Sequence, residues 1–281
     1  MILPDAYRYT RRYQGPIQTV IFDWAGTMVD FGSFAPTQVL IDAFRGFDVE
    51  VTLPEARQPM GLPKWDHIQA LGKIPAVAAR WHACHGRPMT SADVDAIYKT
   101  FLPLQVERVA RYSDPIAGAT QVIENLRKRG AKVGSCSGYP RVVMERLLEH
   151  ARSRGLVVDC AIAADDCKAG GRPGPWMALA NVLELGATDV RACVKVDDTV
   201  PGIEEGLAAG MWCVGIVLSG NEVGLSAAEL ASRSPAAVAE LRARAGATLL
   251  HAGAHLVVDT IADLPAALDL IQERLARGNL E

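Results

Sequence analysis

The stretch IQTVIFDWAGT, residues 17–27, predicts a buried β-strand that ends in an acid. Its first half is rich in apolar and β-branched residues, as expected of a strand that is covered on both faces. Asp23 follows the strand directly, and Gly26 then breaks the extended pattern. In an open α/β sheet, a carboxylate placed in this way lies at the carboxyl edge of the strands, where ligands bind.

From Pro115 onward, strand-like and helix-like segments alternate. Further strands are predicted at 131–135, 158–163, 193–196, 212–217 and 255–258. Helices are predicted at 117–129, 140–154, 174–185 and 200–209, with a last one at the C-terminus. Gly130, Gly186 and Gly210 follow three of these helices, which matches the preference for glycine just past a helix end. Together with the strand at 17–22, the pattern predicts an α/β fold with a doubly wound, Rossmann-like parallel sheet.

Residues 32–112 have a different pattern, with helical stretches and no convincing strand. One helix is predicted to open at residues 90–93, which have the spacing of a capping box. We therefore predict a core domain of residues 1–31 and 113–281, with residues 1–16 as an N-terminal extension. A helical cap domain of residues 32–112 is inserted after the first strand. A cap inserted there would lie over the carboxyl edge of the sheet as a lid.

The composition is that of an ordinary globular protein: 281 residues, 49% apolar and 22% charged. The formal net charge is −3, and both signs are scattered, so nucleic acid and acidic membrane surfaces are poor candidate partners. The first sixteen residues lack the apolar segment of a signal peptide, and the six cysteines form no Cys-x-x-Cys pair. We expect a cytoplasmic protein with reduced thiols.

Polar side chains stand at four places where a predicted strand ends or a loop follows it. They are Asp23, Ser137, Arg172 and the pair Asp197-Asp198. Each suits a part in phosphoryl transfer. A carboxylate attacks phosphorus, a hydroxyl in a Gly-bounded turn binds phosphoryl oxygens, a cation offsets their charge, and paired acids hold Mg²⁺.

In this order, these positions resemble the haloacid dehalogenase superfamily. The resemblance implies that Asp23 is the nucleophile, that Ser137 binds phosphate, and that Arg172 is the charge-balancing cation. It also implies a Mg²⁺ site made of Asp23, the Ala25 carbonyl and Asp198.

The superfamily usually has a further aspartate four residues after the position of Asp198, where this chain has Gly202. The metal geometry is therefore expected to rely more on Asp197. Two readings of Asp197 stay open: a metal ligand through water, or an acid beside the ligands.

Ala25 stands where many of these enzymes have a second aspartate, which protonates the leaving group. Since alanine has no proton to donate, another residue must activate the leaving group, unless it needs no help. Lys64 is a candidate, because Pro63 before it suits a first helical position. The positive helix end and burial under a closed lid would both lower the pKa of this lysine. A neutral lysine forms a Schiff base with a carbonyl, and His67 on the same helical face can shuttle protons.

An imine next to a phosphoryl-transfer site has a chemical purpose. Breaking a P–C bond would otherwise expel a carbanion, which is a very poor leaving group. A protonated imine on the adjacent carbon accepts the electron pair and forms an enamine, so no acid is needed beside the nucleophile.

Five stretches resemble the phosphonoacetaldehyde hydrolase (phosphonatase) family: FDWAGTMVDFGSFAP (22–36), PMGLPKWDHI (59–68), GSCSGYP (134–140), GRPGPWM (171–177) and VKVDDT (194–199). The resemblance implies hydrolysis of phosphonoacetaldehyde to acetaldehyde and phosphate, with Lys64 as the Schiff-base lysine and a dimer made through the caps. It implies substrate-binding positions at Met60, Gly61, His67, Tyr139 and Gly26, besides Ser137 and Arg172. Some members have a cysteine where this chain has Ser33, which is assigned no essential chemistry. Pro63 stands where glycine or leucine is expected, and could alter lid closure.

Three alternatives remain. A phosphomonoesterase or phosphomutase of the same fold would be indifferent to changes of Lys64, and Ala25 argues against it. A non-catalytic phosphonate-binding module would keep the phosphate cradle without turnover, although Asp23 and Asp198 are both present. In the cap, His82 and His85 with Cys84 could instead hold a metal, but lone histidine pairs on one helix are more often surface residues, and no ligand beyond these three is positioned nearby in the sequence.

Overall fold

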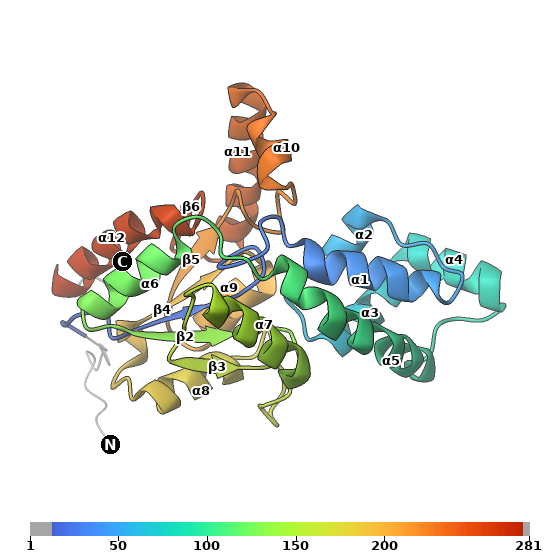
Figure 1. Cartoon of the computed structure of the whole chain (residues 1–281), viewed down its shortest axis with the longest axis horizontal. Coiled ribbons are helices and arrows are strands. Elements are labelled where there is room, and N and C mark those ends of the chain that lie inside the picture. The colour runs from blue at the N-terminus through green and yellow to red at the C-terminus, as the bar shows by residue number, and fades with distance from the viewer. Residues whose placement is uncertain (1–12, 278–281) are drawn as a thin grey trace, which may run out of the picture.

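A computed structural model describes residues 13–277. Its strands are β1 (Thr19–Phe22), β2 (Lys132–Cys136), β3 (Cys160–Ile162), β4 (Cys193–Asp197), β5 (Trp212–Ile216) and β6 (Leu256–Val258). They form one sheet in the order β3-β2-β1-β4-β5-β6, and every neighbouring pair is parallel (Figure 1). The chain progresses outward in both directions from β1, which confirms the doubly wound α/β fold predicted from the sequence.

The register of the central strands aligns their carboxyl ends. Phe22 of β1 pairs with Ser135 of β2 on one side and with Val196 of β4 on the other. Asp23 and Asp197, each one residue further on, therefore lie next to each other at the same edge. This alignment explains why acids that are distant in the sequence meet in one site.

Helices cover both faces of the sheet. One face carries α6 (Ala119–Lys128), α7 (Arg141–Ser153) and α12 (Leu264–Arg277), and the other carries α8 (Trp176–Leu185), α9 (Val200–Ala208) and α11 (Pro235–His251). Short 3₁₀ turns lie at η2 (Val190–Ala192) and η3 (Ile261–Asp263). Along β1, Val20 and Phe22 pack into the first face and Ile21 into the second, as the alternation of a strand requires. The predicted bounds agree with these elements to within two residues.

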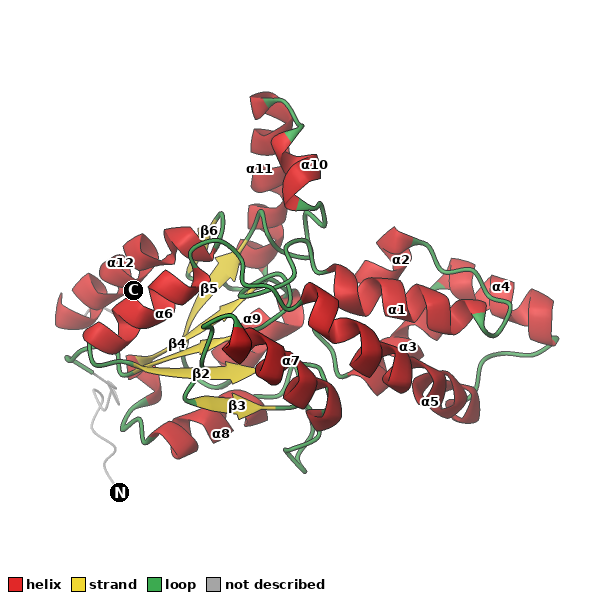
Figure 2. Ribbon diagram, in the orientation of Figure 1, coloured by secondary structure: helices red, strands yellow, loops and turns green. Residues whose placement is uncertain are grey.

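The inserted segment is helical, as predicted. It comprises α1 (Phe34–Arg45), α2 (Leu53–Arg57), α3 (Lys64–Lys73), α4 (Pro75–His85) and α5 (Ser91–Arg108), followed by η1 (Val109–Tyr112). Asp93 accepts a hydrogen bond from the Thr90 backbone N–H at 2.8 Å, so the capping box at the start of α5 is formed. Figure 2 shows the arrowheads of β2 and β3 pointing toward these helices, so the insertion lies over the carboxyl edge of the sheet. The predicted boundaries at residues 32 and 112 fall beside α1 and η1, and the division into two domains stays a prediction.

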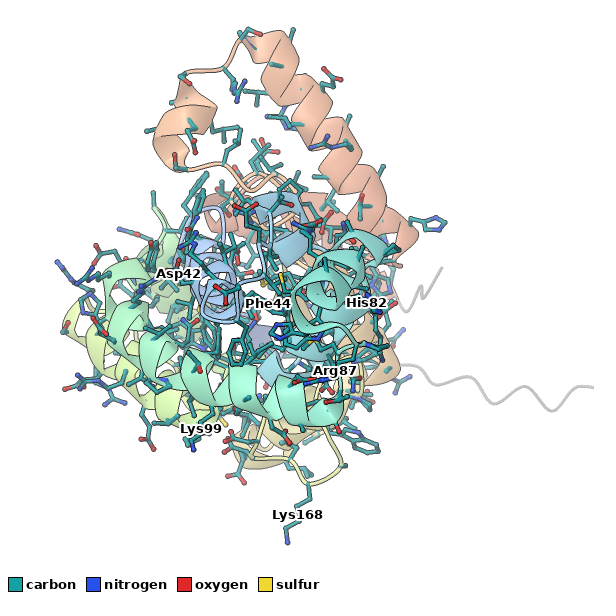
Figure 3. All side chains as sticks on the ribbon, turned by 90° about the vertical axis from the view of Figure 1, so that its right-hand side faces the viewer. Asp42, Phe44, His82, Arg87, Lys99 and Lys168 are labelled. Carbon is teal, nitrogen blue, oxygen red and sulfur yellow. The ribbon has the colours of Figure 1, made fainter. Side chains whose placement is uncertain are left out.

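The cap has its own hydrophobic core, separate from the cores on the sheet. Figure 3 looks at the cap end-on and shows Phe44 in the middle of the helices, while His82 and Arg87 lie toward the rim. Phe44 is buried, and His82 and Arg87 are exposed. The cap is thus a packed helical bundle with a core of its own.

A helical hairpin extends from the core beside the cap and has no counterpart among the predicted elements. It consists of α10 (Ala227–Ala231) and α11, and Figure 1 shows it projecting away from the sheet. Its buried residues, Ala245, Gly246 and Leu249, all lie near the C-terminal end of α11. Most of the hairpin is exposed and rich in alanine. Its sequence therefore lacks the clear periodic pattern of apolar residues that predicts a helix.

Within residues 13–277, no helix combines the length and apolar character needed to cross a bilayer.

We expect Phe44→Ala to lower the free energy of unfolding by about 3–5 kcal/mol, because it leaves a cavity in the cap core. Leu183→Ala on α8 is the matched control, since Leu183 is 80% exposed; its effect should stay within about 0.5 kcal/mol. Urea denaturation of both variants measures this. Equal, small effects would contradict a tightly packed cap.

Candidate active site

The cap closes over the carboxyl edge of the sheet and leaves a small polar cavity. Its lining comes from the ends of β1, β2 and β4, from the loop before α8, and from the cap: Asp23, Ala25, Ser33, Pro36, Met60, Gly61, Lys64, Ser137, Gly138, Tyr139, Arg172 and Thr199. The cavity volume is about 20 Å³, room for one or two water molecules. Eight of the predicted site residues line it. The other three are Gly26, His67 and Asp198: His67 lies on α3 with Lys64, and Gly26, next to Ala25, packs against Asp198.

Asp23 is buried at the tip of β1 and faces a fixed cation. Arg172 Nη1 lies 2.9 Å from Asp23 Oδ1. Burial raises the pKa of Asp23 to about 6, with a further increase from Asp197, while Arg172 opposes the shift. At neutral pH the carboxylate is therefore mostly ionised and paired with a guanidinium.

The Arg172 guanidinium is held in place by carboxylates from three elements. Besides Asp23, it contacts Asp197 through Nη2 at 3.2 Å and donates from Nε to Glu205 at 2.9 Å. Nη2 also donates to the Cys136 carbonyl at 3.1 Å. Because each edge of this planar fork has a partner, the cation cannot turn away from Asp23.

The sequence interpretation missed Glu205 and Lys195, which complete the network under the site. Both side chains are buried, and Lys195 Nζ lies 2.5 Å from Asp197 Oδ2 and 3.5 Å from Glu205. Two sequence features could have indicated these residues: a lysine inside an apolar strand, and an acid on the apolar face of a helix. Charged residues are rarely buried unless they are paired.

Both carboxylate oxygens of Asp197 contact other side chains or backbone groups of the protein. Its Oδ1 accepts hydrogen bonds from the Thr199 backbone N–H at 3.0 Å and from the Thr199 hydroxyl at 2.7 Å, and its Oδ2 faces Lys195 and Arg172. A Cβ added at Gly202 would lie 2.0 Å from the Asp197 carboxyl group. Gly202 therefore leaves room for Asp197, and this packing favours the interpretation of Asp197 as an acid beside the ligands.

Asp198 has no cationic partner among the described ion pairs. It accepts hydrogen bonds from the Asn221 backbone N–H at 2.8 Å and from the Thr27 hydroxyl at 3.2 Å. Burial, followed by the charges of Asp23 and Asp197, raises the pKa of Asp198 well above its usual value. A cation near Asp198 would reverse this shift.

A metal ion fits this place. Asp23, Asp197 and Asp198 each have an oxygen within 4.8 Å of those of the others. A Cβ added at Gly26 would lie 2.2 Å from Asp198 Oδ2, so the loop after β1 packs directly on the acid, and this requires glycine. Asp23 and Asp198 thus offer the hard oxygen ligands that divalent cations prefer, with Asp197 beside them.

Lys64 comes from the cap and is the first residue of α3, with Pro63 as its N-cap. Its side chain is 5% exposed, and Nζ lies 4.0 Å from Met60 Sδ and 5.3 Å from the centre of the Tyr139 ring. Burial lowers the pKa of Lys64 to about 8, and Asp23 opposes the shift. This direction agrees with the lowering expected from the sequence, and its largest cause is loss of water.

His67 is buried behind Lys64 and is neutral. Its Nε2 lies 2.9 Å from the Ala56 carbonyl oxygen, and since a carbonyl only accepts, Nε2 carries the hydrogen. Burial and the nearby Lys64 lower the pKa of His67 well below its usual value. Its Nδ1 is a buried acceptor for which the described residues offer no donor.

The turn after β2 presents polar groups to the cavity. The Ser137 hydroxyl accepts the Tyr139 backbone N–H at 3.2 Å, which leaves the hydroxyl hydrogen free to donate to a ligand. The Tyr139 hydroxyl is buried and unpartnered within the described part of the chain. Both features suit the binding of an oxyanion or an aldehyde.

The cap touches the core by close backbone approach. A Cβ at Gly138 would lie 2.5 Å from the Leu62 carbonyl oxygen, and one at Gly171 would lie 2.4 Å from Pro63 Cγ. Pro63 thus packs on the loop that carries Arg172. The glycines let the lid close tightly without side chains in between.

The histidines of α4 lie away from this site. His85 stacks on Trp81 with ring centres 4.2 Å apart, and its Nε2 contacts the Phe47 carbonyl at 3.0 Å. His82 is exposed (Figure 3). No metal-binding group in residues 13–277 includes either one.

Comparison with known proteins agrees with this geometry. Residues 17–210 match the family model of the haloacid dehalogenase-like hydrolases. A phosphonoacetaldehyde hydrolase of Klebsiella pneumoniae subsp. pneumoniae is 59% identical over 263 residues, which cover 93% of this chain and 98% of that protein. One from Vibrio cholerae is 56% identical over 264 residues, covering 94% and 97%. The chain belongs to the phosphonoacetaldehyde hydrolase family.

A solved structure of a phosphonoacetaldehyde hydrolase-like protein from Oleispira antarctica superposes with a TM-score of 0.94 at 40% identity. The match covers 98% of this chain and 99% of the other. The family and fold that the five sequence stretches indicate are thus confirmed.

We expect Gly202→Ala to destabilise the protein by about 1–3 kcal/mol, because the new methyl group overlaps the Asp197 carboxyl group. Urea denaturation measures this. In the double variant Asp197→Gly with Gly202→Asp, the acid moves to the position where the superfamily usually has it, so the combined loss should be smaller than the sum of the single losses. Strict additivity would contradict direct packing between the two positions.

Proposed function

We propose that this chain hydrolyses phosphonoacetaldehyde to acetaldehyde and phosphate, through a Schiff base on Lys64 and an aspartyl phosphate on Asp23. The main support is that a buried lysine with a pKa near 8 and a buried carboxylate line one small cavity. The names of the relatives support the substrate.

The proposed reaction begins at Lys64. Its neutral amine attacks the aldehyde carbon, water leaves, and a protonated imine forms. Lys64 is poised for this because burial increases the share of neutral amine near neutral pH. We assign to His67 the role of relaying a proton through Nδ1, since its Nε2–H is bound to the Ala56 carbonyl, and its lowered pKa means that it passes the proton on rather than keeping it.

P–C cleavage follows at Asp23. The carboxylate attacks phosphorus, the P–C electron pair moves toward the iminium nitrogen, and an enamine leaves. Arg172 and the Ser137 hydroxyl bind the phosphoryl oxygens during the transfer. A proton then adds to the enamine carbon, and water hydrolyses the resulting imine to free acetaldehyde. A second water cleaves the aspartyl phosphate and regenerates Asp23.

Mg²⁺ is the proposed metal. Asp23, Asp198 and the Ala25 carbonyl would hold it, and it would offset charge on the phosphoryl oxygens. The other proposed ligand-binding positions are Met60 beside Lys64, Gly61, Tyr139 and Gly26. We also propose that two copies pair through their caps, as the family resemblance implies, in the cytoplasm; analytical ultracentrifugation would test the pairing.

A phosphomonoesterase or phosphomutase is the second candidate. It needs an acid to protonate an alkoxide leaving group. Within the described cavity lining, Asp23 is the only carboxyl group, and Ala25 occupies the place of the usual acid. A non-catalytic phosphonate-binding module would have no use for an amine with a lowered pKa.

Borohydride reduction in the presence of phosphonoacetaldehyde, followed by peptide mass mapping, tests the proposal. The adduct should appear on Lys64, because reduction traps the imine. Trapping should become faster as pH rises through about 8, since the neutral amine is the reactive form.

Lys64→Arg should abolish both trapping and phosphate release. Lys73→Arg, at the exposed end of the same helix, should leave both unchanged. Full activity in Lys64→Arg would remove the imine from the mechanism. Turnover of sugar phosphates by that variant would favour the second candidate.

A further inference from the structure

The guanidinium of Arg57, a cap residue, is bound by the core loop after β5 and by the segment that leads into α1. Its Nη1 donates to the Gly32 carbonyl at 2.7 Å and to Asn221 Oδ1 at 3.2 Å, and its Nη2 donates to the Gly224 carbonyl at 3.2 Å. The guanidinium carbon lies 5.1 Å from the centre of the Phe34 ring. Arg57 belongs to α2, whereas Asn221 and Gly224 belong to the loop after β5.

The space around Arg57 depends on Gly224. This residue has φ 63°, and a Cβ there would lie 2.7 Å from Arg57 Cζ. Neighbouring cap arginines differ, because Arg45, Arg80 and Arg108 pair with carboxylates of the cap itself. The hydrogen bonds of the Arg57 guanidinium instead go to uncharged groups, and two of these groups, on Asn221 and Gly224, lie on the core.

The same loop also contacts Asp198. The Asn221 backbone N–H donates to Asp198 Oδ2 at 2.8 Å, and Asn221 Nδ2 donates back to the Arg57 carbonyl at 3.3 Å. A Cβ at Gly220 would lie 2.6 Å from Asp198 Cβ. Asn221 is therefore a direct bridge between the cap arginine and the acid.

The loop also holds the two turns next to the nucleophile. The Ser219 hydroxyl donates to the Gly26 carbonyl at 2.8 Å, and its own carbonyl accepts the Gly32 N–H at 2.7 Å. One short segment, residues 219–224, thus connects the acid, the turn after Asp23 and the start of the cap.

The closed cavity, at about 20 Å³, is too small for a phosphonate, so the cap must open for a substrate to enter. Because Asn221 and Gly224 lie on the core and Arg57 lies on the cap, opening separates Arg57 from these two partners. Asn221 then loses its partner in the cap, and the loop that orients Asp198 is less constrained.

We propose that Arg57 is a positioning residue that latches the closed cap and, through Asn221, orients Asp198 for the metal cation. Cap closure and metal affinity are then linked, and by thermodynamic reciprocity the bound cation favours the closed cap by the same factor. This inference rests on the metal site of the proposed function.

Calorimetric titration with Mg²⁺ alone, without substrate, tests the link. Arg57→Gln should weaken Mg²⁺ binding about 10–100-fold, as loss of partners that orient a ligand typically does. Arg57→Lys keeps the positive charge but loses the planar guanidinium group. Its Mg²⁺ affinity should therefore lie between the affinities of the wild type and of Arg57→Gln. Arg80→Gln is the matched control, because Arg80 is a half-buried cap arginine that pairs with Glu55 of α2, and it should bind like the wild type.

Hydrogen exchange at the Asn221 and Gly32 amides provides a second readout. In the wild type, Mg²⁺ should slow exchange at both, and Arg57→Gln should accelerate it, while Arg80→Gln should not. Wild-type Mg²⁺ affinity together with unchanged exchange in Arg57→Gln would overturn the latch. Failure of the wild type to bind Mg²⁺ would instead refute the proposed metal site, and the exchange rates without metal would still decide whether Arg57 holds the loop.

Discussion

Enclosure of the Lys64 amine beside the tip of β1 is the constraint on which the chemistry of this molecule depends. An ammonium group is stabilised by water, so a lid that removes water lowers the pKa of the amine. The same enclosure strengthens the attraction between Asp23 and Arg172, because the local dielectric is low. The lid can approach so closely because Gly138 and Gly171 present bare backbone to it.

Under the cavity, the core holds several buried charges that must offset one another. Arg172 and Lys195 lie among Asp23, Asp197 and Glu205, and Asp198 adds a further acid without a basic partner among the described ion pairs. Buried ion pairs contribute little to net stability, so their value here is orientation. A metal cation would neutralise the negative charge of Asp198. The loop of residues 219–224 connects Asp198 to Arg57 of the cap through Asn221.

The sheet and the acids at its edge were predictable from sequence because they depend on local signals. Apolar strands, glycines after helices, and Asp23 at a strand end all appear in short windows. The burial of Lys64 was inferred from chemistry, since Ala25 removes the acid that other leaving groups need. The first inference uses residues that are neighbours in the sequence, whereas the second uses the chemistry that the residue at position 25 leaves unprovided.

Contacts between distant segments were not predictable in the same way. Nothing near Glu205 or Lys195 in the sequence indicates their partners, because the fold places Glu205 against Arg172, and Lys195 against Asp197 and Glu205. Arg57 gave no signal either, because its partners lie 25 and 164 or more positions away along the chain. The exclusion of a side chain at Gly202 likewise depends on where the Asp197 carboxyl group points.

The most direct measurement is the pKa of Lys64 itself, by NMR titration of protein with isotope-labelled lysine, with the resonance assigned from Lys64→Arg. A midpoint near 8 is predicted for the closed site. A midpoint near 10.5, the value of a solvated lysine, would contradict an amine held ready to capture an aldehyde.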